Sequence, residues 1–196
     1  MQIAVCICAI LAAMPALAAE HMTVSVCSPG HLSAKLLAGA ESVAANLFHS
    51  AGIEIVWARC ELGLEGDAAV RQHWFTVRFR AGRPFVPPAL AALDTLGEAF
   101  TSVDEPGYIV EVYYEAVETL AQTKQSEVST LLGFAMAHEL GHLLLGPQHA
   151  PRGVMRAAWD LNDLEAMRQG CLRFRPAESA RMRTVLHASD VRAAAP

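Results

Sequence analysis

The chain is poor in charge, and in positive charge above all. Only 18% of its 196 residues are charged, and 15 lysines and arginines stand against 20 aspartates and glutamates, giving a net charge of −5. A protein that binds nucleic acid through phosphates needs a basic face. The balance excludes a general nucleic-acid binder. Arginines outnumber acids only from Arg152 onward, which leaves a local basic patch open beside the simpler interpretation of a solvated helix surface.

Internal repeats and low-complexity linkers are also absent, so nothing in the sequence divides it into separate units. Hydrophobic residues make up 53% of the chain. A chain of this length and composition can bury the core of one compact domain but not of two large ones. We therefore expect residues 19–196 to form a single domain that works as a monomer.

Residues 1–18 contain no charged side chain. The apolar stretch from Ile3 to Leu17 is shorter than the ~20 residues that a membrane-spanning helix needs, and it ends in the A-x-A sequence at residues 16–18. These features resemble a secretory signal peptide cleaved after Ala18 or Ala19. We predict a secreted or periplasmic protein that has no membrane contact once the signal is removed.

Few cysteines remain beyond that segment: Cys27, Cys60 and Cys171. Their odd number allows at most one disulfide within the chain. An exported protein can hold such a bond, and Cys27 can pair with Cys60 if the strands that carry them are neighbours. The pairing itself is left open by the residues.

The sequence His-Glu-Leu-Gly-His at residues 138–142 carries the chemistry of the chain. On a helix, His138 and His142 project from one face and can reach a common metal ion. The carboxylate of Glu139 would point toward the open position of that metal, where it can take a proton from water. The motif predicts two zinc ligands and a general base.

A third protein ligand is expected, because a catalytic zinc usually has three and keeps its fourth position open. His149 is the nearest candidate. Gly146 can end the helix in a left-handed conformation and Pro147 prevents the helix from resuming, so the chain turns back there.

The stretch from Ala137 to Trp159 resembles the metzincin branch of the zincin metallopeptidases, whose pattern H-E-x-x-H-x-x-G-x-x-H precedes a methionine-containing turn. Residues 143–145 make the first interval one residue longer here, and Met155 follows His149 sooner than in most metzincins. A looser match over residues 97–183 is to small exported bacterial zinc metalloproteases.

The metzincin resemblance implies zinc bound by His138, His142 and His149. In the gluzincin branch, a glutamate on a later helix completes the site, which leaves Glu165 as the alternative third ligand. Tyr108, Arg152 and His187 are candidates for stabilising an oxyanion.

Hydrophobic periodicity gives the order of the elements. It predicts strands at residues 22–27, 53–58, 74–80, 97–101 and 108–114, and helices at 32–48, about 126–145, 159–167 and from 176 onward. The first two strands should be parallel across a right-handed crossover, and the last two should form a hairpin. Residues 115–123 are left as a short helix or a loop, and Ser126 is expected to cap the long helix.

The fold class expected is α+β, a metzincin-like zincin whose mixed twisted sheet packs on the active-site helix, followed by a short C-terminal helical subdomain. The function expected is zinc-dependent hydrolysis of peptide bonds, with an extended substrate added to the strand at residues 97–101. The alternative is a catalytically idle exported domain, stabilised by zinc, that binds a partner. A structural zinc usually has four protein ligands and needs no base, so Glu139 favours the enzyme.

Overall fold

The computed structural model describes residues 19–28, 30, 32–60, 73–82, 95–100 and 108–193. The expected signal segment, residues 1–18, lies outside them. The elements in chain order are β1 (Glu20–Cys27), α1 (Ala34–Ser50), β2 (Ile53–Arg59), β3 (Trp74–Arg80), β4 (Gly97–Phe100), β5 (Ile109–Tyr113), α2 (Tyr114–Lys124), α3 (Val128–Leu145), α4 (Leu161–Arg168) and α5 (Pro176–Ala193).

The described strands form one mixed, mostly parallel sheet in the order β2-β1-β3-β5-β4. β1 is parallel to β2 and β3, and β3 is parallel to β5. β4 is antiparallel to β5, with Gly97 opposite Val112. The predicted parallel pair and the predicted hairpin are therefore both confirmed, and β4 is the last strand of the sheet on its side.

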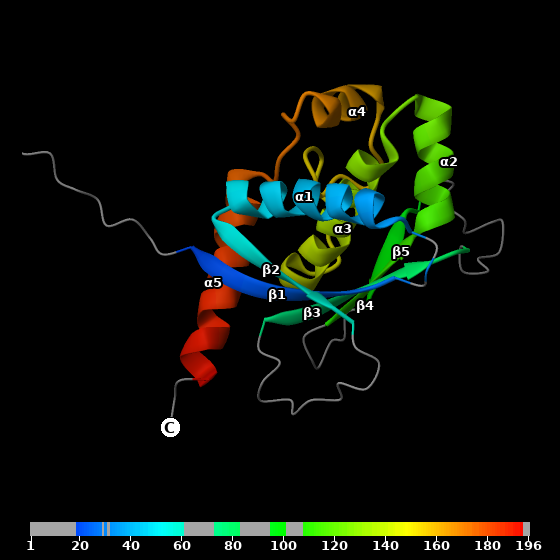
Figure 1. Ribbon diagram of the computed structural model, residues 1–196. Coiled ribbons are helices and arrows are strands. Elements are labelled where there is room, and N and C mark those ends of the chain that lie inside the picture. Colours follow the sequence, from blue (N-terminus) through cyan, green and yellow to red (C-terminus); the bar gives the residue numbers. More distant parts are fainter. Residues whose placement is uncertain are drawn as a thin grey trace, which may run out of the picture.

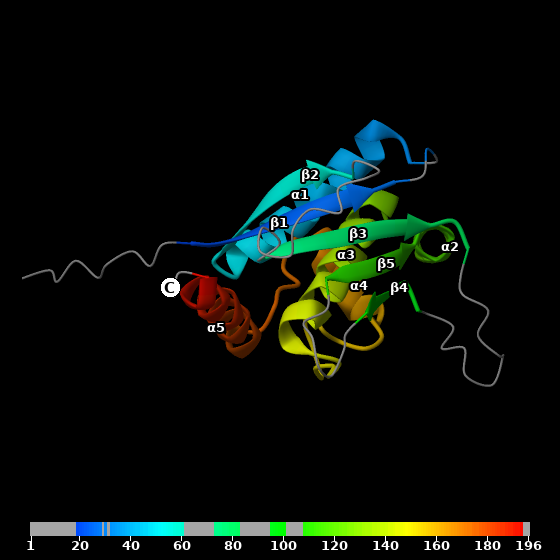
Figure 2. The same ribbon diagram turned by 90° about the horizontal axis from the view of Figure 1, so that it is seen from below.

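Two helices lie on one face of this sheet and form the core with it. Figure 1 shows α1 and α3 above the strands, and Figure 2, seen from below, shows the strands in front of the same two helices. α5 lies beside the sheet near the beginning of β1. The expected mixed sheet packed on the motif-bearing helix is thus present.

α3 is buried on nearly all sides, which explains its composition. By length and hydropathy it could cross a membrane, but 78% of it is buried inside the protein, and a helix that is apolar all round is typical of a core. Gly133 lets α1 approach closely, because a Cβ there would lie 2.6 Å from the carbonyl oxygen of Ala40. The motif therefore sits on a rigid element.

A disulfide joins Cys27 at the end of β1 to Cys60 just after β2. These strands are direct neighbours, so the condition under which the sequence allows this pairing is met, and the structure settles the pairing that the residues alone leave open. Cys171 is free and exposed.

The start of α3 differs from the prediction. Ser126 does not cap the helix: the N-cap is Glu127, whose side chain makes no capping bond, and the first turn holds no acid. The N–H of Ser126 instead donates to the carbonyl of Ala121 at the end of α2, and Gln125 is left-handed with φ 52°. Ser126 completes the preceding helix because the segment left open in the sequence is helical.

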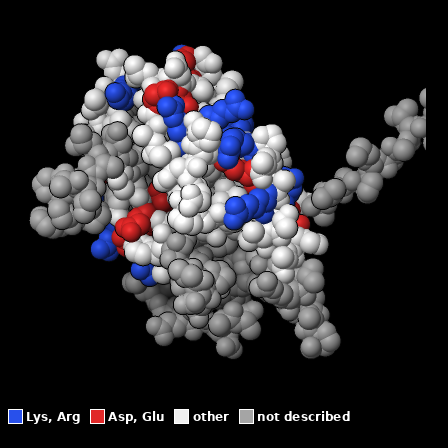
Figure 3. All heavy atoms as spheres, turned by 180° about the vertical axis from the view of Figure 1, so that it is seen from behind, with Lys and Arg blue, Asp and Glu red and all other residues white. Residues whose placement is uncertain are grey.

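In the view from behind, lysine and arginine side chains lie together on the side of the molecule toward α5 (Figure 3). Many of the arginines come from the chain from Arg152 onward. Several are paired with acids of the same segment, including Arg168 with Glu165 and Arg175 with Glu178. This pairing favours an ordinary solvated surface over a strongly basic patch.

Candidate metal centre

Three histidines converge at the C-terminal half of α3. His138 and His142 come from successive turns of the helix, and His149 comes from the loop that follows it. One ring nitrogen of each lies within 4.8 Å of the others. His138 and His142 are buried, whereas His149 is exposed. The cluster can therefore hold one ion that remains accessible from the side of His149.

Backbone carbonyls determine which nitrogen of each buried ring carries its proton. The Nδ1–H of His138 donates to the carbonyl of Val154 at 2.8 Å, and the Nδ1–H of His142 donates to that of Gly146 at 2.9 Å. A carbonyl can only accept, so the proton of each neutral ring is on Nδ1 and both Nε2 atoms carry a lone pair. Metal-binding histidines are commonly oriented by such bonds.

The two Nε2 atoms lie only 3.0 Å apart. Two lone pairs at this distance repel unless a cation lies between them. A proton is a poor candidate, because the pKa of His138 is lowered to about 4, mainly by burial and in part by His142 and His149, despite the bond to Val154. Burial also lowers the pKa of His142. The donor set thus fits a divalent metal such as zinc, for which neutral imidazoles are ordinary ligands.

The turn after α3 brings His149 to the other two rings. Gly146 has φ +84° and ψ −175°, a conformation that side chains disfavour, and its N–H donates to the carbonyl of His142. The positive φ expected from the sequence is present, although ψ is extended rather than left-handed. The ring centroid of His149 lies 5.4 Å from that of His138 and 4.8 Å from that of His142.

The loop from Gly153 to Met155 supports the cluster from below. The N–H of Val154 donates to the carbonyl of Arg173, while the carbonyl of Val154 accepts from both His138 and the indole of Trp159 at 3.3 Å. The Trp159 ring stands edge-on to His138, with centroids 5.6 Å apart. The carbonyl of Val154 therefore positions both the candidate ligand His138 and the indole ring of Trp159.

Met155 is fully buried beneath the motif. A Cβ on Gly141 would lie 2.5 Å from its sulfur, so the glycine between Leu140 and His142 makes room for this methionine. The methionine turn that the metzincin resemblance implied is packed directly under α3.

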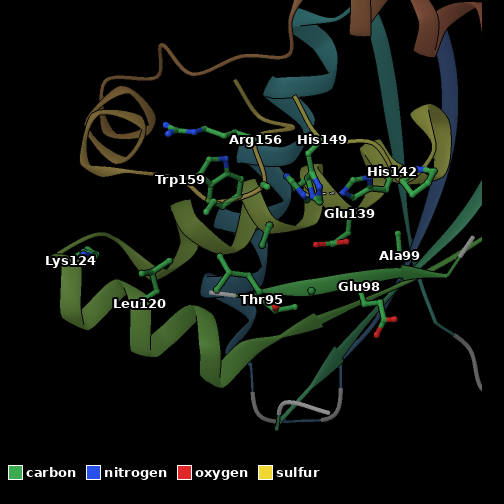
Figure 4. A pocket seen from close by; sticks show the side chains of 17 residues that line it. Thr95, Glu98, Ala99, Leu120, Lys124, Glu139, His142, His149, Arg156 and Trp159 are labelled. Carbon is green, nitrogen blue, oxygen red and sulfur yellow. Dashed lines mark hydrogen bonds between the residues drawn. The ribbon is translucent and has the colours of Figure 1, made fainter. Parts of the chain in front are cut away.

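Glu139 lies beside the histidines with its carboxylate toward the same cleft (Figure 4). No group in the described ranges hydrogen-bonds to it, and it is 7% exposed. Burial raises its pKa to about 8, with a smaller contribution from the charge of Glu98. A nearby divalent cation would favour the carboxylate and lower this pKa. A cation held by the histidines would therefore change the protonation state of this carboxyl group.

β4 forms one wall of the site through Gly97. A Cβ on this glycine would lie 2.7 Å from Cγ of Glu139 and 2.7 Å from the carbonyl oxygen of Glu111. The missing side chain is what lets Glu139 lie against the strand. A glycine inside a strand often marks such a close approach. The sequence therefore carries a signal for this contact, although it predicts for Gly97 only the hairpin and the substrate-binding strand.

The cluster opens into a cleft of about 520 Å³. One wall comes from residues 95–99, one from α3, and one from the loop that carries His149 and Trp159. α2 contributes Leu120 and Lys124 at one end. The sequence predicts Trp159 only as the start of a helix and gives Lys124 no role, so neither is expected to line the site; no local pattern links α2 to the motif.

The alternative third ligand lies elsewhere. Glu165 is on α4, where its carboxylate pairs with Arg168 at 2.6 Å, and it does not line the cleft. Tyr108, Arg152 and His187 are also outside the cleft lining, and His187 lies 3.5 Å from the carboxylate of Glu20. The structure brings His149, and not Glu165, to His138 and His142.

Comparisons with known proteins find similar chains among the solved structures. No family model matches the chain, and no curated protein matches it either. Among solved structures, the chain is similar to archaemetzincin from Methanopyrus kandleri, with 17% identity and a TM-score of 0.46 over 87% of this chain and 96% of that one.

Proposed function

We propose that this chain is an exported zinc-dependent endopeptidase in which Glu139 is the general base. The observation that carries the proposal is the pair of Nε2 atoms, 3.0 Å apart and both unprotonated, with a third imidazole beside them. A buried carboxylate without a hydrogen-bond partner in the described part of the chain shares their cleft. A structural metal site has no use for such a base.

His138, His142 and His149 would hold the metal, and the Nδ1 bonds to Val154 and Gly146 would keep the two helical rings in place. When bound, zinc supplies Lewis-acid polarisation of a carbonyl and makes water acidic enough to lose a proton near neutral pH. Three protein ligands leave a position for water or substrate. The exposure of His149 supports access to that position.

Glu139 would accept the proton from the attacking water on its carboxylate and return it to the leaving amine. Its backbone is fixed by α3 and its side chain is confined by Gly97. The helix and the contact with Gly97 together limit the conformations of Glu139, so its side chain needs little reorganisation when the substrate binds.

An extended peptide can add to β4, which ends the sheet among the described strands. Its outer backbone groups face away from β5, and no strand in the described part of the chain pairs with them, so a peptide strand could do so. Residues 95–99 line the same cleft as the histidines, so a peptide paired there would pass the candidate metal centre. This arrangement supports a peptide substrate over a small molecule.

Cleavage of a mixed peptide library by zinc-loaded protein tests the proposal. Wild type should cleave, Glu139→Gln should lose at least about a thousandfold in kcat/KM, and Glu165→Gln should match wild type because its carboxylate pairs with Arg168. Stoichiometric zinc with no cleavage by wild type would instead favour the idle binding domain.

Export is proposed from residues 1–18 and is supported by the Cys27–Cys60 disulfide, because such bonds persist in oxidising compartments. Expression of the full chain in a bacterium with an outer membrane, followed by N-terminal sequencing, tests it. The periplasmic or secreted protein should begin at Ala19 or Glu20. Recovery of uncleaved chain in the cytosol would refute export while leaving the peptidase proposal intact.

A further inference from the structure

We infer that the end of the cleft between α2 and Trp159 is a substrate subsite selective for an acidic side chain, and that Lys124 confers this selectivity. The inference rests on the proposed peptidase function and adds a substrate class to it. Figure 4 shows Leu120 and Lys124 of α2 across from Trp159 and Arg156, at the end away from Ala99.

The subsite adjoins the reacting centre. The ring of Trp159 lines it and also stands 5.6 Å from the ring of His138. A side chain that enters between α2 and Trp159 therefore belongs to a residue close to the scissile bond, on one side of it. Recognition there can affect both binding and turnover.

The walls of the subsite are mainly apolar. Leu120 precedes Lys124 by one helical turn, so both project from the same side of α2. Trp159 lies across from them, and Ala135 of α3 is a further apolar residue of the cleft. Such a pocket fits the methylene groups of a side chain whose polar end reaches the rim, where Lys124 lies.

The charged side chains along the cleft determine the sign of the electrostatic potential at the subsite. Apart from the histidines, the described residues that line the cleft include four with ionisable side chains: Glu98, Lys124, Glu139 and Arg156. Arg156 donates to Asp160 at 2.6 Å and to Asp163 at 2.5 Å, so two carboxylates neutralise it.

Lys124 differs from Arg156, because the ammonium group of Lys124 makes no ion pair or hydrogen bond with the described part of the chain. At the other end of the cleft, the carboxylate of Glu98 accepts from the hydroxyl of Tyr113 at 3.2 Å. The potential thus becomes more positive from Glu98 toward Lys124. A carboxylate on the substrate is attracted to the Lys124 end, and a cationic side chain is disfavoured there.

Paired peptides that carry Glu or Gln at each of three positions on either side of the scissile bond isolate the charge, because the two side chains have nearly the same shape. Zinc-loaded wild type should show about a fivefold higher kcat/KM for Glu at one position next to the bond, as expected for a partly solvated ion pair. Lys124→Met should abolish the preference, and Lys124→Glu should reverse it in favour of Gln.

Lys35→Met is the matched control, because Lys35 is the only other lysine of the chain and is exposed on α1, outside the cleft lining. It should keep the preference of wild type. Equal rates for Glu and Gln peptides with wild type, or an unchanged preference in Lys124→Glu, would overturn the inference.

A binding measurement separates this inference from the peptidase proposal. Zinc-loaded Glu139→Gln protein can be titrated with the same peptides, with tryptophan fluorescence as the readout because Trp159 lines the subsite. Tighter binding of the Glu peptide, lost on adding Lys124→Met, would support the subsite even if no peptide were cleaved. Equal affinities would overturn it even if wild type proved to be a peptidase.

Discussion

His138 and His142 direct unprotonated Nε2 atoms at each other across 3.0 Å, because each ring gives its Nδ1 proton to a backbone carbonyl. This is an unfavourable arrangement for two neutral imidazoles alone. A shared cation turns the repulsion into two attractive contacts. The first prediction follows from this relationship.

Purified protein should bind one zinc ion, and chelation should lower its melting temperature. A ligand at one hundred times its Kd stabilises the native state by about 2.7 kcal/mol. His142→Ala should abolish binding and His149→Ala should weaken it at least tenfold. His49→Ala, on the surface of α1 beside Glu54, is the control. Full zinc occupancy in His149→Ala together with loss in Glu165→Ala would show that Glu165 is the third ligand.

The stability of metal-free protein should depend on pH through Glu139 and His138. Burial raises the pKa of Glu139 to about 8, so its folded form gains stability as pH falls from 8 toward 4.5. Burial lowers the pKa of His138 to about 4, so its contribution is present above 6.5 and is lost as pH falls toward 4.

Urea unfolding with a chelator between pH 4 and 9 measures both effects. As the pH falls from 9 to 6.5, the unfolding free energy of wild type should rise. The rise should be about 1.4 kcal/mol for each pH unit below the folded-state pKa of Glu139. Glu139→Gln should be flat over that range and lose stability below it, whereas in wild type the continuing gain from Glu139 should offset the loss from His138 down to about pH 4.5. Parallel curves for the two proteins above pH 6.5 would contradict the prediction.

Gly97→Ala should reduce activity more than stability. The new methyl group would meet the side chain of Glu139 and the carbonyl of Glu111 at 2.7 Å, and a displacement of about 1 Å in a catalytic group can cost a hundredfold in rate. Gly82→Ala, which meets nothing within 4 Å, is the matched control. Peptidase assays and thermal unfolding of both variants check this prediction. Equal activities of Gly97→Ala and Gly82→Ala would refute it.

Gly141→Ala should destabilise the protein by about 1–3 kcal/mol, because the methyl group would overlap the sulfur of Met155. The cost should be smaller in a Met155→Ala background, where that sulfur is absent. A double-mutant cycle by denaturant unfolding measures the coupling. Strictly additive effects would show that the two residues do not share this space.

Replacing Cys27 and Cys60 together by serine should lower the unfolding free energy by about 3–4 kcal/mol, the value expected for a bond that closes a loop of 33 residues. Cys171→Ser should change it little, because this cysteine is free and exposed. Calorimetry of the three proteins checks the difference. A loss as large in Cys171→Ser as in the double variant would be inconsistent with it.

The local elements and the motif could be predicted from the sequence because their signals are local. Alternation from Trp74 to Arg80 matches β3 residue for residue, and Gly146 followed by Pro147 correctly predicts where α3 ends. The spacing of His138 and His142 depends only on helical geometry. The Cys27–Cys60 pairing is left open by the residues, because it requires that β1 and β2 be neighbours.

The lateral order of the strands and the composition of the cleft could not be predicted in this way. The position of β3 between β1 and β5 depends on contacts between distant segments, which periodicity does not encode. Lys124 reaches the cleft only because α2 packs at its end. The prediction for Ser126 is wrong because a serine at this position suits the N-cap of α3. In the structure, the left-handed conformation of Gln125 lets the N–H of Ser126 donate to the carbonyl of Ala121 at the end of α2.

The candidate metal ligands are confined to one short stretch, from His138 to His149, while the walls that would select a substrate come from residues 95–99 and from α2. Chemistry and selectivity are therefore carried by different segments of the chain. Under the proposed function, substitutions at Leu120 or Lys124 would change which peptides are bound and would leave the metal ligands unchanged. The architecture is modular in this sense, and related proteins could diverge in substrate while sharing one reaction.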